Sequence, residues 1–366
     1  MAASTQDAVS RRLIEAVRAA GADRVTLDLR GGGTKGFYAG PPRGRPLELA
    51  ELAGISAYEP SELVISARAG TPLALLEAAL ADRGQCLPFE PPRFAPAGTV
   101  GGMVAAGLAG PARAAQGSVR DHLLGATILD GRAEVLSFGG QVIKNVAGYD
   151  VARLFAGSWG ILGVLLEVSL KVLAVPPARA TCRLPCTHAQ ALQRLAQWAA
   201  KPWPLSASAW YEDQLYLRFA GAGAAVEAAV AECAGIMLEP ALADRWWEEV
   251  RDHRLAFFRP DEAAIAAGEA LWRVSLPANA GWRAPAGRQL FEWGGALHWW
   301  RGVAEPEELR GAARSAGGHA TLVRAADKPD GAFDALGEAS GVIHRRLKQS
   351  FDPFGIFNPG RLYPDL

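Results

Sequence analysis

The sequence predicts an α+β protein of two domains. Glycine-rich loops separate short strands and helices along the first half of the chain, and Pro176-Pro177 then interrupts it. The second half groups its strands and helices differently and carries ten of the eleven tryptophans. With 366 residues, half of them hydrophobic, the chain can build two cores of ordinary size. We therefore expect one domain over residues 1–176 and a second from residue 177.

In the first half we expect strands at 25–29, 63–67 and 162–172. A helix is predicted after Gly70, with Thr71 as its N-cap, Pro72 in its first position and Gly84 at its end. Its buried stripe would be Leu73, Leu76 and Leu80. Residues 126–138 predict a hairpin around the Asp130-Gly131 turn.

In the second half, helices are expected at 187–200, 222–234 and 305–317, and strands at 206–219, 271–276 and 295–301. The pairs Trp246-Trp247 and Trp299-Trp300 are core residues or a surface for another subunit. Adjacent side chains in a strand point to opposite faces, so Trp299 and Trp300 need a helix layer or a second chain on one side. We predict a subunit contact that includes Trp247 and Trp300.

The composition of the chain argues against several classes of protein. Lys plus Arg and Asp plus Glu are 38 each, which argues against a nucleic-acid partner. The most apolar stretch, 161–175, is too short for a membrane span and contains two charges. The four cysteines form no C-x-x-C, so no metal site is predicted and Cys182 and Cys186 are expected to be structural. We expect a cytoplasmic protein without a secretory signal or direct membrane insertion.

Two glycine-rich segments carry the strongest local signal. Residues 30–36 read Arg-Gly-Gly-Gly-Thr-Lys-Gly directly after a strand, and glycines let backbone N–H groups converge on an anion. The spacing matches neither a Rossmann nor a P-loop motif. Residues 96–107 place small side chains at a helix start, where the amides favour a phosphate. A plain turn and tight helix–sheet packing are the alternatives, but two such segments fit an extended ligand with two phosphates.

Two further glycine-containing segments, 117–125 and 144–163, follow the first two along the chain. Together the four segments resemble the FAD-binding domain of the vanillyl-alcohol oxidase and p-cresol methylhydroxylase superfamily. The ending 351–362 resembles that of the superfamily's 2-hydroxy-acid dehydrogenases. More narrowly, the chain resembles the smaller flavin subunit of glycolate oxidase over essentially its whole length. The residues that carry this narrower resemblance are 90–92, 138–150, 272–277, 293–297 and 317–321.

The resemblance implies a two-subdomain FAD-binding domain at 1–176, an α+β cap domain at 177–340 for substrate and subunit contact, and a segment, 341–366, that returns to the flavin. It implies that the cofactor is FAD. The residues that match the family's FAD contacts are Gly31, Gly32, Gly33, Thr34 and Lys35 at the pyrophosphate, Gly98, Thr99, Gly101 and Gly102 beside the flavin, Ser118 and Asp121 in the third segment, Gly160 and Gly163 at the adenosine, and Asn358 and Arg361 in the C-terminal segment.

Some relatives attach the flavin covalently through His or Cys. Residues 30–36 and 98–102 contain neither, and Cys86 lies outside both loops, so we expect non-covalent FAD. The larger flavin subunit of this enzyme class carries a His-x-Gly-Asp-Gly-Asn-x-His segment that this chain lacks. His319, after Gly317-Gly318, is the candidate base. Arg273, Arg301 and Arg324 are candidate ligands for a substrate carboxylate, and the sequence does not rank them.

The resemblance implies an oxidoreductase subunit that oxidises glycolate, or another 2-hydroxy acid, to glyoxylate or the corresponding 2-oxo acid. Its expected partners are a second, catalytic flavin subunit and an iron–sulfur subunit, and its expected place is the cytoplasm, peripheral to the inner membrane through the complex. One alternative is a non-catalytic subunit that holds FAD for assembly or electron relay. Another is a stand-alone flavin reductase of the same fold, which the C-terminal motifs favour less.

Overall fold

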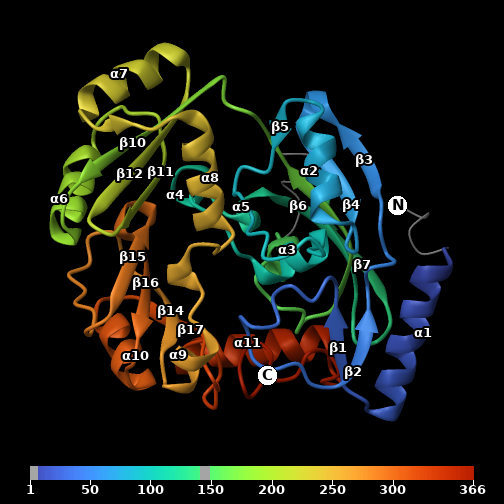
Figure 1. Ribbon diagram of the computed structural model, residues 1–366. Helices are drawn as coiled ribbons and strands as arrows, with labels where there is room; N and C mark the ends of the chain where they lie inside the picture. Colours follow the sequence, from blue (N-terminus) through green and yellow to red (C-terminus); the bar gives the residue numbers. More distant parts are fainter. Residues whose placement is uncertain (1–6, 141–148) are drawn as a thin grey trace.

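The computed structural model describes residues 7–140 and 149–366 and arranges most of their strands in two sheets (Figure 1). The smaller sheet is antiparallel, with the order β3-β4-β8-β6-β7. Its strands are β3 (Ile55–Glu59), β4 (Val64–Arg68), β8 (Val164–Lys171), β6 (Leu123–Leu129) and β7 (Val135–Gly139). Residues 144–148 of the fourth family segment lie outside the described residues.

A parallel pair of short strands completes the first half. β1 (Leu27–Arg30) pairs with β2 (Arg45–Glu48), after α1 (Ala8–Asp23), whose first amides are capped by the Asp7 carboxylate. One hydrophobic core joins α1, this pair and the five-stranded sheet. The other elements of this half are α2 (Leu73–Ala81), β5 (Gln85–Cys86), α3 (Val100–Ala106), α4 (Arg113–Gln116), α5 (Val119–His122), β9 (Leu173–Ala174) and the 3-10 turns η2 (Pro60–Glu62) and η3 (Ala152–Phe155).

The larger sheet has eight antiparallel strands and begins at Ala178, directly after Pro176-Pro177. In spatial order they are β13 (Ile236–Met237), β10 (Ala178–Pro185), β12 (Gln214–Gly221), β11 (Leu205–Tyr211), β15 (Arg288–Glu292), β16 (Leu297–Gly302), β14 (Ala270–Ser275) and β17 (His319–Arg324). The helical elements of this half are α6 (His188–Trp198), α7 (Gly223–Cys233), α8 (Pro240–Arg251), α9 (Glu262–Ala266), α10 (Pro306–Ser315) and the 3-10 turns η4 (Ala256–Phe258) and η5 (Trp293–Gly295). The predicted α+β class is confirmed.

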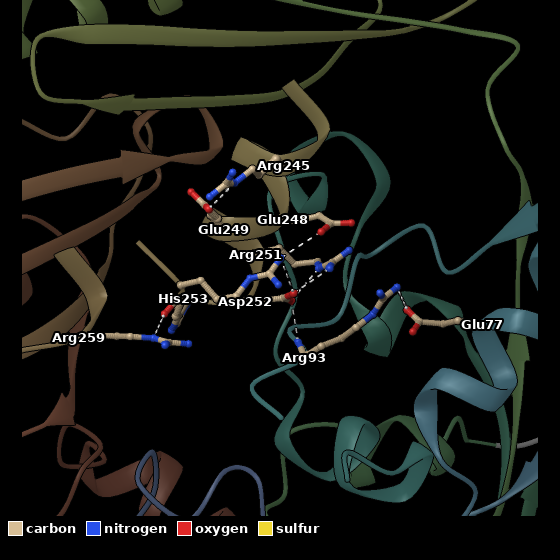
Figure 2. A network of polar contacts seen from close by, with 10 residues as sticks. Glu77, Arg93, Arg245, Glu248, Glu249, Arg251, Asp252, His253 and Arg259 are labelled. Carbon is tan, nitrogen blue, oxygen red and sulfur yellow. Dashed lines mark hydrogen bonds and ion pairs between the residues drawn. The ribbon is translucent and has the colours of Figure 1, made fainter. Parts of the chain in front are cut away.

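A polar network ties the end of α8 to the first half (Figure 2). The Asp252 carboxylate accepts hydrogen bonds from the Arg93 backbone N–H at 2.9 Å and from Arg251 Nε at 2.7 Å. The Arg93 guanidinium in turn donates to Glu77 of α2 at 2.7 Å. Because Asp252 is buried, this network fixes how the two halves meet beside the neighbouring His253.

The chain returns to its beginning after α11 (Glu338–Phe351), drawn along the bottom of Figure 1. Leu27 N–H donates to Ile356 O at 2.6 Å, and Asn358 N–H donates to Leu27 O at 2.9 Å, so the C-terminal segment lies along β1. Buried Lys348 holds this return, since its ammonium donates to Ile161 O, Phe357 O and the Asp352 carboxylate at 2.7–2.8 Å.

Three local predictions need correction. The expected strand 206–219 is a hairpin of β11 and β12, which turns at Glu212-Asp213, both with positive φ. The loop between β6 and β7 is longer than a two-residue turn, because the Asp130 carboxylate accepts from the N–H groups of both Arg132 and Glu134. Thr71 does not cap α2, because its hydroxyl donates to the carbonyls of Gly54 and Arg68 instead.

The tryptophan pairs belong to the core, so the predicted subunit contact through Trp247 and Trp300 is wrong. Trp299 and Trp300 are 3% and 0% exposed and occupy different clusters on the two faces of the sheet. Trp299 packs edge-to-face against Phe258 of η4, while Trp300 lies in the cluster that α10 covers. Trp247 is 4% exposed and donates from Nε1 to the Thr181 hydroxyl. Helical elements of this chain therefore bury the tryptophan side chains on both faces of the sheet, without a second chain.

Candidate functional site

A cavity of about 310 Å³ opens where β1 ends, between the loop 30–36, the start of α3 and the C-terminal segment. Most of the predicted cofactor residues line it: Gly31, Gly32, Gly33, Thr34, Lys35, Thr99, Gly101, Gly102, Gly160, Gly163, Asn358 and Arg361. Residues that are 329 positions apart in sequence thus meet around one space.

Three predicted residues do not line this cavity. Gly98 lies next to it, where an added Cβ would stand 3.9 Å from the Thr34 hydroxyl. Ser118 and Asp121 form a capping box at the start of α5, in which the Asp121 carboxylate accepts from the Ser118 N–H at 2.7 Å. That bond accounts for the lowered pKa of Asp121, and Ser118 lines a second cavity instead.

The glycines allow two backbone segments to touch. A Cβ built on Gly32 would lie 1.5 Å from the Ala97 carbonyl oxygen, and one on Gly31 would lie 2.4 Å from the Thr99 hydroxyl. Thr99 caps α3 by accepting the Gly102 N–H at 3.2 Å, and a Cβ on Gly101 would strike Ala69. The first two glycine-rich segments therefore form one wall whose surface is largely backbone.

Lys35 supplies positive charge to this wall. Burial lowers the pKa of Lys35 to about 8. Its ammonium lies 3.5 Å from the Thr34 hydroxyl, and no carboxylate pairs with it among the described residues. A desolvated ammonium beside close-packed glycine amides fits an anionic group such as a pyrophosphate.

Asn358 builds the cavity without offering its amide to a ligand. Its Oδ1 accepts from Leu29 N–H at 2.8 Å, and its Nδ2 donates to Trp159 O at 2.7 Å. The side chain thus fixes the end of β1 and the turn at Gly160, where a Cβ would meet Asn358 Nδ2 at 2.6 Å. Arg361 donates to Gly40 O, and burial lowers the pKa of this arginine.

A second cavity of about 350 Å³ adjoins the first, and the two share Ala106 and Trp159 in their walls. Among the described residues its wall contains no aspartate or glutamate but three arginines and three histidines: Arg113, Arg120, Arg273, His253, His319 and His344. Burial lowers the pKa of His319, with Arg273 acting in the same direction and Asp334 against it. Burial also lowers the pKa of His253 to about 3, so this imidazole is neutral near pH 7.

Strand register places several of these groups on one face of the larger sheet. Arg273 of β14 lies opposite Thr321 of β17, and Ser275 lies opposite His319. Residues two apart in a strand share a face, so Arg273, Thr321 and His319 point to the same side. The Arg273 guanidinium donates to the Ser275 hydroxyl at 2.9 Å, which holds it over this face.

The three candidate arginines differ in their partners and in whether they line the second cavity. Arg301 is buried, makes two hydrogen bonds to the Glu269 carboxylate and donates to Ala256 O, so its charge is neutralised within the chain. Arg324 lies 3.8 Å from the ring centre of Phe37 and lines neither cavity. Arg273 alone of the three faces the second cavity.

Sequence reasoning did not identify Arg113 and Trp293, which also line this cavity. Arg113 stands between two of the glycine-rich family segments, and its position there was the only available signal. Trp293 donates from Nε1 to Gly110 O at 3.0 Å, across the two halves of the chain. Its role depends on how the halves pack, which no local pattern reveals.

Comparisons with known proteins agree with this geometry. A family model described as an FAD binding domain matches residues 9–139, and the chain is a flavoprotein whose cofactor is FAD. The solved structure of an alkyldihydroxyacetonephosphate synthase superposes with a TM-score of 0.62 at 16% identity, covering 95% of this chain and 74% of that one. The predicted vanillyl-alcohol oxidase type of fold is confirmed.

The glycolate oxidase subunit GlcE of Escherichia coli (strain K12) is 43% identical over 357 residues, 98% of each chain. This chain belongs to the family of that subunit. The glycolate oxidase subunit GlcD of Bacillus subtilis (strain 168) is 28% identical over 160 residues, 43% of this chain and 34% of that protein.

The described residues form neither a metal-binding group nor a membrane-spanning helix. Within residues 7–140 and 149–366, no three His, Cys, Asp or Glu side chains come together in a group that could hold a metal ion. Across the same residues, no helix has the length and apolar character needed to cross a membrane. The four cysteines are free thiols, and Cys182, Cys186 and Cys233 are buried.

Proposed function

We propose that this chain is the FAD-holding subunit of a multi-subunit oxidoreductase that converts glycolate, or another small 2-hydroxy acid, to the 2-oxo acid. The whole-length likeness to a glycolate oxidase subunit supports the substrate class. The observation that carries the proposal is the second cavity, which adjoins the FAD cavity and has basic but no acidic side chains in its wall. A carboxylate substrate would find compensation for its charge there.

The side chains of this cavity have distinct roles in the proposal. Arg273 binds the substrate carboxylate, and Thr321 beside it offers a hydroxyl. His319, whose pKa lies below its usual value, is neutral near pH 7 and accepts the proton of the substrate hydroxyl. FAD, when bound, supplies the acceptor for the hydride equivalent. Trp159 lines both cavities, so it lies between the substrate and the cofactor in this proposal.

The partners in this proposal are a second, catalytic flavin subunit and an iron–sulfur subunit. In this proposal electrons leave the flavin through these partners. The described residues contain no group of His, Cys, Asp or Glu side chains that could hold a metal ion. Attachment to the inner membrane would then be peripheral, through the complex. Co-purification with the neighbouring subunits, followed by flavin counting per chain and an assay of glycolate-dependent acceptor reduction, tests the proposal as a whole.

A second candidate function is a non-catalytic role in assembly or electron relay. It is favoured by the absence of the histidine-rich segment that the larger flavin subunit carries. The two candidates differ in what the chain does by itself with substrate.

We expect glycolate to bleach the flavin of the isolated chain at least tenfold more slowly than that of the assembled complex. The reason is that this chain lacks the His-x-Gly-Asp-Gly-Asn-x-His segment of the catalytic relative, and general bases contribute about 10²–10⁴-fold. Anaerobic absorbance at the flavin band measures both rates. Rapid stoichiometric reduction of the isolated chain would exclude the relay role, and loss of that reduction in His319→Gln would identify the base.

The FAD should be held without a covalent bond. Neither cavity-forming glycine segment contains His or Cys, and Cys86 does not line the FAD cavity. Acid precipitation of the purified chain is expected to release all flavin into the supernatant. Flavin fluorescence that stays with the denatured polypeptide on a gel would contradict this assignment.

A further inference from the structure

We propose that the second cavity binds a dicarboxylate, with one carboxylate on Arg273 and the other on Arg113. The inference rests on the proposed function for the first of these contacts and adds a second anion site to the same cavity. It extends the substrate class from glycolate to 2-hydroxy acids that carry a second carboxylate.

Two guanidinium groups from different halves of the chain meet at one aromatic ring. The Arg113 guanidinium carbon, from α4, lies 4.6 Å from the centre of the Trp293 ring, and that of Arg273, from β14, lies 5.2 Å from it. Both groups line the second cavity. The pKa of Arg113 is lowered by burial and then by the charge of Arg273, so the two cations repel each other.

Among the described residues no carboxylate forms an ion pair with Arg113 or Arg273, although Asp121 and Glu292 act on them electrostatically. Asp121 is taken by the N–H and hydroxyl of Ser118, and Glu292 accepts from Trp299 Nε1 at 2.9 Å. Asp334 pairs with Arg314 at 2.8 Å. These are the acids that act on Arg113, Arg273 or His319 electrostatically, and each already has a partner.

The charge in the cavity therefore exceeds what a monocarboxylate compensates. One carboxylate on Arg273 leaves Arg113 unpaired, with Arg120 also in the wall. The cavity volume of about 350 Å³ also leaves room for a ligand larger than glycolate. A water-sized group occupies ~30 Å³, and glycolate has only five non-hydrogen atoms. A four- or five-carbon dicarboxylate places one anionic group on each guanidinium, and each contact is a charge-assisted hydrogen bond.

Matched pairs of acids that lack a hydroxyl group, and so are not oxidised, test this inference. The FAD-loaded chain is titrated with succinate against propionate and with glutarate against butyrate, by calorimetry and by the change in the flavin spectrum. We expect the dicarboxylates to bind at least tenfold more tightly, because a charged hydrogen bond contributes about that much. Arg113→Gln should remove this advantage and leave propionate within about twofold of the parent, whereas Arg273→Gln should weaken both classes.

Arg346→Gln, an exposed arginine of α11, is the control and should change neither class. Arg113→Lys, which keeps the charge, should retain part of the dicarboxylate preference and serves if the glutamine variant loses FAD. Equal affinity for the two classes, or equal losses in Arg113→Gln, would overturn the inference and leave the proposed function standing. Dicarboxylate binding through Arg113 without any glycolate-dependent acceptor reduction by the complex would instead refute the proposed function.

Discussion

Replacement of Gly32 by alanine is expected to remove FAD from the protein. The added Cβ would lie 1.5 Å from Ala97 O and 2.4 Å from Ala97 C, and both are backbone atoms that no side-chain rotation can move. The loop 30–36 must then leave the start of α3, and the wall that faces the cofactor opens. Overpacking of this kind costs about 1–3 kcal/mol or more, so we expect FAD affinity to fall at least tenfold.

The measurement is flavin absorbance per chain, together with a dissociation constant from fluorescence titration. Gly36→Ala is the matched control in the same loop, because its Cβ would stand 3.7 Å from Gly33 O, an ordinary contact. Far-UV circular dichroism establishes that both variants fold. Parental FAD affinity in a folded Gly32→Ala protein would mean that the loop is an ordinary turn with no part in binding the cofactor.

Trp300→Ala should destabilise the protein by about 3–5 kcal/mol, the range for a fully buried large aromatic side chain. Its side chain is 0% exposed, and its Nε1 donates to Pro285 O at 3.0 Å. The substitution leaves both a cavity and an unpaired carbonyl. Urea unfolding of the FAD-loaded chain, followed by intrinsic fluorescence and circular dichroism, measures the loss.

Trp246→Ala is the comparison, since Trp246 is half-buried and stacks on Tyr216 at 3.7 Å between ring centres. A loss of about 1 kcal/mol is expected there. If Trp300→Ala unfolded at the parental urea concentration yet no longer co-purified with partner subunits, the original prediction of a subunit contact would be restored.

Local chemistry explains which predictions succeeded. Gly32 and Gly101 are needed because their backbones lie close against Ala97 and Ala69. Gly33 has a φ of +65°, so short runs of glycine in the sequence are enough to predict these positions. The helices near 188, 223 and 306 follow from local sequence patterns, and the structure has them within two residues of the predicted starts. Signals of this kind need no knowledge of distant segments.

The missing parts depend on contacts between distant segments. Nothing in the sequence distinguishes Arg273 from Arg301, because Glu269, which neutralises Arg301, is 32 residues away. The sequence does not show whether a helix layer or a second chain covers Trp299 and Trp300. In the structure η4 and α10 cover them. The turn at Glu212-Asp213 was missed because neither residue is the glycine or asparagine that usually marks positive φ.

The return of residues 356–358 to β1 has a consequence for biosynthesis. The backbone N–H of Leu27 donates to Ile356 O, and that of Leu29 donates to Asn358 Oδ1. Arg361 lines the cavity as well. On the ribosome, β1 must wait for more than 300 further residues before these partners exist. Until then the proposed FAD cavity lacks part of its wall, so we expect FAD to bind only after that late segment has left the exit tunnel. A pool of free FAD and protection of the unpaired β1 edge during translation are then requirements for a high yield of holoprotein.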